Sequence, residues 1–197
     1  MKKSTASGNQ SFSMRQAFFG VDPIRRLNYF AGQLLSTDDF TAEQNYHRNK
    51  QRRHNLRCHG VGVVRGLKVS TVRKNSGWWV AIEPGVGIDP AGNEIELCTT
   101  AQLQLPKSLA AILVGIRFSE RLCAPVPSLS DPTLTGSQPS RVEEGCEVVL
   151  DPVPMPRRSR GEGKGADIFQ DVLPLAHLVR AGSVWRVSRK FKAPRAR

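Results

Sequence analysis

The sequence lacks any apolar run of the about 20 residues that crossing a bilayer requires. Its first residues, MKKSTASGNQSFSM, begin with two lysines but contain no apolar stretch of about 7–15 residues, which a secretory signal needs. The cysteines are few and far apart, and they form no CxxC pair: Cys58, Cys98, Cys123 and Cys146. We therefore expect a cytoplasmic chain with reduced thiols and no disulfide framework.

Acidic residues are scarce. Seventeen Asp and Glu stand against twenty-nine Lys and Arg, giving a formal net charge of +12. Such an excess indicates an acidic partner, a nucleic acid, or many subunits that share the charge. The bases concentrate in residues 48–57 and in residues 186–197, which contain six bases and no acid. A solvated surface and a disordered tail would account for this distribution without a nucleic acid.

Apolar residues are also below the usual share. They make up 39% of the chain, against about 45–50% in typical domains when glycine is included. A chain of 197 residues nevertheless suits one domain with appendages, and it can bury on the order of 70% of its unfolded surface. The question is which part of the chain supplies that core.

A polar helix is predicted from about residue 38 to about residue 58. Ser36 with Asp39, or Thr37 with a later carboxylate, can cap its first turn. Acids precede bases along the segment, as the helix dipole favours, and Gly60 is a suitable end. Residues spaced alternately four and three apart lie on one face of this helix. That face contains a single aromatic and no aliphatic residue: Phe40, Gln44, His47, Gln51 and His54. A helix with so little apolar surface is expected to pack across subunits or over a sheet edge.

The chain after Gly60 has a β pattern. Residues 61–72 are rich in β-branched residues, and further strands are predicted at 78–82, 94–97, 103–105 and 111–118. Residues 173–179 and 184–187 flank Ala-Gly-Ser and predict a closing hairpin. The fold class expected is α+β, with one long N-terminal helix packed on a mainly antiparallel β sandwich or small barrel with long irregular loops.

These patterns give six predicted segments. Residues 1–24 form a flexible or partner-ordered arm, 25–60 a turn plus helix, and 61–122 the β domain. Residues 123–166 form a Pro/Gly-rich insertion with one short strand, 167–188 the closing hairpin, and 189–197 a basic tail.

The sequence contains no convincing catalytic or metal-binding constellation. His54 and Cys58 share a helix face next to His59, but a structural zinc usually needs four ligands and no paired cysteines supply the rest. The acids Asp38 and Asp39 already have a capping role, and no nucleophile accompanies them. We therefore predict no catalytic residue, no metal, no cofactor and no enzymatic activity.

The alternative function is a nucleic-acid-binding module that uses the basic helix and the C-terminal tail. Bases along RNKQRRHNLR could neutralise phosphates. They are spread around the helix, however, and no helix-turn-helix, RRM or zinc-finger pattern accompanies them. The sequence therefore favours protein partners over nucleic acid.

The run NYFAGQLLSTDDFTAEQNYHRNKQRRHNLRCHGVGVVRGLKV resembles the N-terminal signature of structural proteins of contractile phage tails and phage-tail-like injection systems. The resemblance lies in an aromatic-Phe-x-Gly-Gln-x-Leu turn that begins at Tyr29, a helix motif at Asp39–Tyr46, a base-and-His-Asn element at Arg52–Asn55 that is one residue shorter than usual, and His59–Leu67. Residues 83–95 resemble a strand-turn-strand of the same proteins, with departures at Gly87 and Asn93.

The resemblance implies a non-enzymatic structural subunit at the baseplate or cap periphery of such a particle. Its partners would be sheath, tube, baseplate or cap proteins, and it would form a homo-oligomeric ring of six-fold or related symmetry. The residues expected to bind these partners are the aromatic and basic ones of the turn and helix: Tyr29, Phe30, Phe40, Tyr46, Arg48, Arg52, Arg53, His54 and Arg57.

Overall fold

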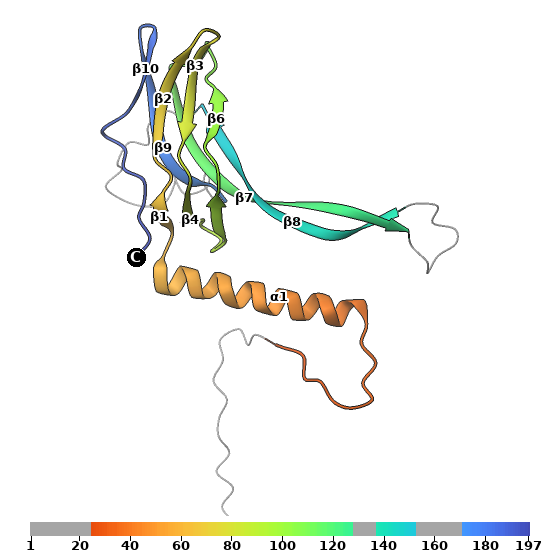
Figure 1. Cartoon of the computed structure of the whole chain (residues 1–197). Helices are drawn as coiled ribbons and strands as arrows, with labels where there is room; N and C mark the ends of the chain where they lie inside the picture. Colours follow the sequence, from red (N-terminus) through yellow and green to blue (C-terminus); the bar gives the residue numbers. More distant parts are fainter. Residues whose placement is uncertain (1–24, 128–136, 153–170) are drawn as a thin grey trace, which may run out of the picture. The chain divides into compact units, whose positions relative to one another are not determined.

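The computed structural model describes residues 25–127, 137–152 and 171–197 (Figure 1). The chain divides into two compact units, residues 1–46 and residues 47–197, and the boundary falls within the long helix. The predicted arm, residues 1–24, and the Gly-rich part of the predicted insertion lie outside the described residues.

The predicted helix is present as α1, Thr37–His54, continued by one π-helical turn, η1, Asn55–His59. Gly60 ends it, as predicted, with a φ of +74° that glycine adopts without a side-chain penalty. The amide of Gly60 donates to the Asn55 carbonyl at 2.9 Å, which is the five-residue spacing of a π-turn. No side chain of α1 is buried.

In the part of the chain that the structure describes, ten strands form three antiparallel sheets. Their bounds are β1 Gly62–Gly66, β2 Val69–Lys74, β3 Gly77–Ile82, β4 Gly85–Ile88, β5 Glu94–Leu97, β6 Ala101–Gln104, β7 Ala111–Pro127, β8 Ser137–Asp151, β9 Leu173–Ala181 and β10 Val184–Val187. The sheet orders are β1-β4-β5, β2-β3-β6 and β10-β9-β7-β8. The α+β class, with one helix and mainly antiparallel sheets, is confirmed.

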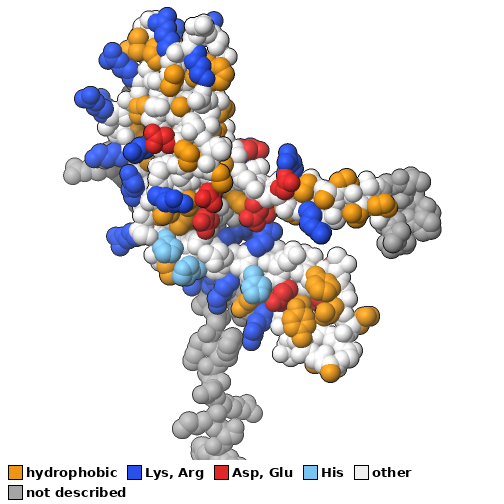
Figure 2. Space-filling view, in the orientation of Figure 1, with side chains coloured by type: hydrophobic (Ala, Val, Ile, Leu, Met, Phe, Trp, Pro, Cys, Tyr) orange, Lys and Arg blue, Asp and Glu red, His pale blue; other side chains and the backbone are white. Residues whose placement is uncertain are grey.

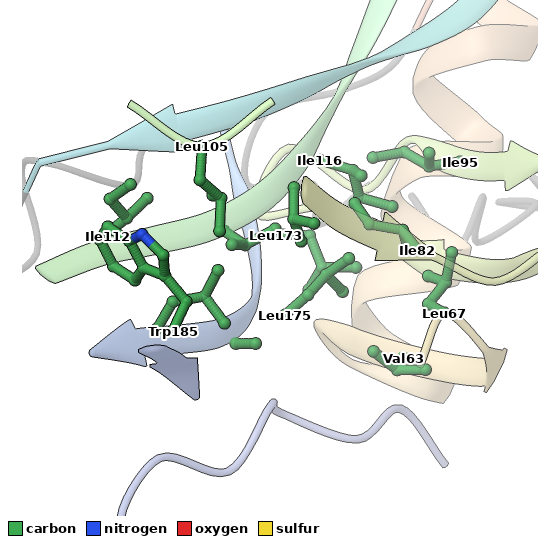
Figure 3. Packing of buried hydrophobic residues seen from close by; sticks show 14 residues of the cluster. Val63, Leu67, Ile82, Ile95, Leu105, Ile112, Ile116, Leu173, Leu175 and Trp185 are labelled. Carbon is green, nitrogen blue, oxygen red and sulfur yellow. The ribbon is translucent and has the colours of Figure 1, made fainter. Parts of the chain in front are cut away.

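The hydrophobic core lies where the three sheets face one another (Figure 3). Ile95 of β5, Ile82 of β3 and Ile112 of β7 are all at most 1% exposed. Leu173 of β9 and Trp185 of β10 close the cluster. Each such side chain contributes about 1.5–3 kcal/mol by leaving water, so the stability of the chain is concentrated in residues 47–197.

Two details of the strand prediction are wrong. The run predicted at residues 61–72 is split into β1 and β2, because Gly66 and Leu67 have φ values of +63° and +52° that turn the chain. The residue pattern also does not predict strand β4, because residues 84–88 contain a proline and two glycines and look like a turn. Only the resemblance of residues 83–95 to a strand-turn-strand implied a strand there.

The prediction of one short strand in residues 123–166 is also wrong. Strands β7 and β8 form a long two-stranded ribbon that pairs residues 113–127 with 137–151, and its outer part runs beyond the other strands of the sheet (Figure 1). Pro125 lies directly opposite Pro139 in this ribbon. Proline cannot donate to a neighbouring strand, so it fits a ribbon where its nitrogen faces away from the partner strand. The prolines that argued against strands are thus compatible with this ribbon.

The basic tail predicted at residues 189–197 lies against β1. The Val63 amide donates to the Pro194 carbonyl at 2.8 Å, and the Ala196 amide donates back to the Val63 carbonyl at 3.2 Å. Gly62 permits this approach, since a Cβ there would lie 2.4 Å from the Ala196 nitrogen. The basic residues of this segment are therefore held on the β domain.

The four cysteines are free, and burial raises the pKa of the Cys146 thiol. Within the described ranges, no helix has the length and hydropathy that spanning a bilayer would take.

Candidate docking surface

The N-terminal turn presents two aromatic side chains to solvent. The Gln33 amide donates to the Phe30 carbonyl at 3.2 Å, and Gly32 between them has a φ of +84°, as the third residue of a type II turn requires. The Gln33 side chain also accepts from the Phe30 amide at 3.4 Å. Tyr29 and Phe30 are 54% and 66% exposed, so the turn is closed by polar contacts and leaves both rings outward.

Ser36 and Asp39 form a reciprocal cap at the start of α1. The Asp39 carboxylate accepts from the Ser36 amide and hydroxyl, each at 2.8 Å, and the Ser36 hydroxyl accepts from the Asp39 amide at 3.2 Å. Of the two caps that the sequence allowed, the structure contains this one. The backbone amide of Ser36, followed by its hydroxyl, lowers the pKa of the Asp39 carboxyl.

The cap makes the start of α1 sensitive to acid. Because the folded chain lowers the pKa of Asp39, the stabilisation is present above the ordinary value of about 4 and is lost as the pH falls through the lowered value. We expect the protection of the amides of residues 36–40, relative to their intrinsic exchange rate at each pH, to fall below about pH 4, and the protection in Asp39→Asn to be low already at neutral pH. Asp38→Asn is the matched control, and equal behaviour of the two variants in pH-resolved hydrogen exchange would contradict the cap.

The described part of the first unit, residues 25–46, contains no buried residue. It instead exposes four large apolar side chains: Tyr29, Phe30, Leu34 and Phe40. Leu34 is 93% exposed and Phe40 is 56% exposed. We call these four residues the apolar set. Exposed apolar groups that gather within one short segment are typical of a surface that another protein covers.

The second half of α1 and η1 is held by the β domain through polar contacts. Arg52 donates to the Asn93 side chain at 2.6 Å, and the buried Asn55 donates to the Gly92 carbonyl at 2.9 Å. Asn93 is itself fixed by Asp89, whose carboxylate accepts from its amide and its side chain at 2.8 Å. Residues 89–93 therefore form a rigid turn that receives the end of the helix.

Arg48 is also occupied within the chain. Its guanidinium lies 2.6 Å from the Glu120 carboxylate on β7. The Arg48 side chain is 40% exposed and the Glu120 side chain is 34% exposed. Because solvent screens the pair, it contributes only about 0–1 kcal/mol. Arg48 and Arg52, both predicted to bind partners, thus use their guanidinium groups inside residues 47–197.

The remaining predicted residues divide by exposure. Tyr46 and Arg53 are half-buried, whereas His54 and Arg57 are exposed. His54 lies 3.5 Å from the Cys58 sulfur and packs edge-on against His59, with the ring centroids 5.4 Å apart. Within the described residues, no group of three or more His, Cys, Asp or Glu is arranged to hold a metal ion.

Three residues of this surface and of the contacts that hold the helix are not among the predicted site residues: Leu34, Asn55 and Glu120. Leu34 was passed over because it precedes the helix and belongs to no periodic pattern. Asn55 was passed over because its acceptor, Gly92, is 37 residues away. Glu120 lies on a strand longer than predicted. For Asn55, the signal available was its place in the base-and-His-Asn element Arg52–Asn55 of the resemblance.

No protein-family model matches the chain, and no curated protein matches it. Among solved structures it is similar to TssK in a crystal structure, with a TM-score of 0.47 and 13% identity over 84% of this chain and 41% of that chain. It is also similar to a chain of the TssK–TssF–TssG baseplate subcomplex of the type VI secretion system, with a TM-score of 0.48 and 14% identity over 87% of this chain and 62% of the other.

A third similar structure is a chain of the baseplate complex from the type VI secretion system, with a TM-score of 0.45 and 15% identity. It covers 87% of this chain and 60% of that one. The present chain thus spans less than two thirds of the length of each of these baseplate proteins. Likeness at this level of identity and TM-score carries no inference about what the present chain binds.

Proposed function

We propose that the chain is a non-enzymatic structural subunit of a contractile, phage-tail-like injection system, located at the periphery of its baseplate or cap. It acts by protein–protein assembly, with sheath, tube, baseplate or cap proteins as partners, in a ring of six-fold or related symmetry. The resemblance of residues 28–69 to structural proteins of such particles supports this class of function.

The observation that carries the proposal is the apolar set on residues 25–46. A segment that buries none of its own residues gains no stability from a core, while each ordered residue costs about 1–2 kcal/mol of backbone entropy. Covering Tyr29, Phe30, Leu34 and Phe40 would offset that cost. Aromatic side chains are enriched at protein interfaces, so another protein chain is the partner that fits.

Two bases near the end of the helix, in residues 47–197, offer a second contact of a different kind. Arg57 is exposed and Arg53 is half-buried, and neither is part of an ion pair among the described residues. Unpaired arginines at the rim of an interface attract acidic partner surfaces and fix the orientation of docking. Arg48 and Arg52 instead hold the helix on its own β domain.

We expect Arg53→Glu with Arg57→Glu to prevent incorporation into particles while leaving the β domain folded. The two glutamates would repel the acidic partner surface that the two arginines attract. The measurement is the amount of the chain that co-sediments with particles purified from cells that produce them. The matched control is Arg73→Glu with Arg186→Glu on strands β2 and β10, which removes the same charge elsewhere.

Normal incorporation of the first double variant would contradict the role of these arginines. Loss of incorporation by both double variants, with both chains still folded, would show that net charge rather than this position decides assembly.

A further inference from the structure

Three segments of the β domain contain bases and no acids. Segments 68–82, 101–112 and 172–197 together contain eleven Lys and Arg and no Asp or Glu. They supply β2, β3, β6, β9, β10 and the ordered C-terminal segment. Figure 2 shows Lys and Arg side chains over the upper end and the left side of this domain, with apolar and acidic side chains between some of them.

Side-chain contacts bring these segments together. The Trp78 indole on β3 donates to the Ser183 carbonyl at 2.7 Å, which joins the β2–β3 hairpin to the β9–β10 hairpin. Further along, the Thr71 hydroxyl of β2 donates to the Trp185 carbonyl of β10 at 3.1 Å. Arg180 of β9 donates to the Lys107 carbonyl, which adds the connection between β6 and β7.

We call six exposed bases of these segments the cationic flank: Arg73, Lys74, Lys107, Arg180, Arg186 and Lys190. None of these bases forms an ion pair with an acid of the described residues. The ion pairs of the described ranges are Arg48–Glu120, Arg65–Glu96, Arg117–Glu147 and Arg121–Glu143. None of them includes a base of the cationic flank.

A second copy of the chain is a poor source of the missing anions. A second copy carries the same net charge of +12, and four of its described acids, Glu96, Glu120, Glu143 and Glu147, are already paired with its own arginines. Arg121 and Arg117 hold the pKa of Glu143 and of Glu147 below the ordinary glutamate value, as expected for occupied carboxylates. The partner must therefore bring its own negative charge.

The side chains among the bases favour phosphates over a protein surface. Protein interfaces are enriched in aromatic residues and arginine and are depleted in lysine and serine. In the three basic segments, the large apolar side chains that are exposed are Val72 and Val187, each 39% exposed. None of the exposed large apolar side chains in these segments is aromatic. The exposed polar neighbours are serine, asparagine and glutamine, as at Ser70, Asn75 and Gln102. Bases mixed with hydroxyl and amide groups are the donors that contact nucleic-acid backbones.

We propose that the cationic flank binds the phosphate backbone of nucleic acid without reading its sequence. This binding is independent of the apolar set. It does not use the basic helix that the sequence suggested, but it includes Arg186 and Lys190 of the basic C-terminal region, together with bases of β2 and β9 and of the connection between β6 and β7. Lys74 lies over the Trp79 ring at 4.5 Å and donates to Gln102, so one base of the flank is held in place before a ligand arrives.

The test uses the full chain and a 30-base-pair DNA duplex of random sequence in fluorescence anisotropy. The variant is Arg73→Gln with Arg186→Gln and Lys190→Gln. The control is Arg26→Gln with Lys50→Gln and Arg57→Gln, which lowers the net charge of +12 by the same three units at exposed positions elsewhere. We expect the flank variant to lose about tenfold or more in affinity, with a salt slope lower by about three, and the control to change less than about threefold.

Equal losses by the two variants would overturn the proposal, because net charge alone would then explain the binding. Equally tight binding of poly-L-glutamate, or of vesicles rich in phosphatidylserine, would overturn it in favour of an acidic protein or a membrane surface. Binding of the duplex by the unmodified chain weaker than about 100 μM at 150 mM salt would overturn it as well, since non-specific binding is typically tighter. Thermal unfolding of each variant shows that the β domain stays folded.

Discussion

Gly85→Val is expected to unfold the β domain or to destabilise it by about 4 kcal/mol or more, a large share of the about 5–15 kcal/mol that stabilises a typical domain. Gly85 of β4 pairs with Gly66 of β1. A Cβ at Gly85 would lie 2.4 Å from both the Arg65 carbonyl oxygen and the Leu67 nitrogen. These are backbone atoms of a paired strand, so they cannot move aside as a flexible side chain would.

The expected loss of stability is large because β1 and β4 border the hydrophobic core. Separating β1 from β4 would expose Val63, Leu67 and Ile95, which belong to the hydrophobic core. The matched control is Gly145→Val on β8, where a Cβ meets nothing within 4 Å. Valine suits an open strand position, so that variant should change stability by less than about 1 kcal/mol. Urea unfolding of both variants measures the difference, and similar midpoints would show that β1 and β4 do not approach each other this closely.

The triple variant Phe30→Ser, Leu34→Ser and Phe40→Ser should lose incorporation into particles by more than a thousandfold in effective affinity. Burying a large apolar side chain on a partner contributes about 1.5–3 kcal/mol, and each 1.4 kcal/mol is a factor of ten. The three residues are 66%, 93% and 56% exposed in the isolated chain, so their replacement should leave its unfolding temperature unchanged.

A control with three other exposed apolar residues separates docking from general hydrophobicity. Val64→Ser, Val72→Ser and Val187→Ser alter side chains that are 47%, 39% and 39% exposed on the β domain. This variant should still enter particles. If the first variant enters them as well, the apolar set does not dock the chain.

The parts of the fold that follow from local chemistry were predictable. The Ser36–Asp39 cap and Gly60 define the helix because capping and termination depend on neighbours a few residues away. The closing hairpin was also predicted, and it is present as β9 and β10. In both cases the signal and the structure it specifies lie within the same short segment.

The parts that were missed depend on distant partners. Strand β4 contains Gly85 and Gly87, where any side chain would collide with β1 or with Leu173, and this need for close approach looks like a turn in the sequence alone. The order of the C-terminal segment depends on Val63, more than 130 residues earlier. The ribbon of β7 and β8 tolerates prolines only because its outer edges are unpaired among the described strands.

The same reasoning explains which site residues could be foreseen. Exposed aromatics near a polar helix are visible in the sequence, so Tyr29, Phe30 and Phe40 were included among the predicted partner-binding residues. The sequence does not show whether an arginine forms a hydrogen bond or an ion pair within its own chain. Arg48 and Arg52 are held by Glu120 and Asn93, at separations of 72 and 41 residues.

Hydrogen exchange of residues 37–46, compared between the purified chain and the same chain in assembled particles, tests the central claim most directly. This part of α1 buries no side chain, so its amides should exchange readily in the isolated chain and become at least about tenfold slower in particles, where a neighbouring protein covers the apolar set. Amides already as well protected in the isolated monomer as in the particle would show that this segment needs no partner, and would contradict the proposed function.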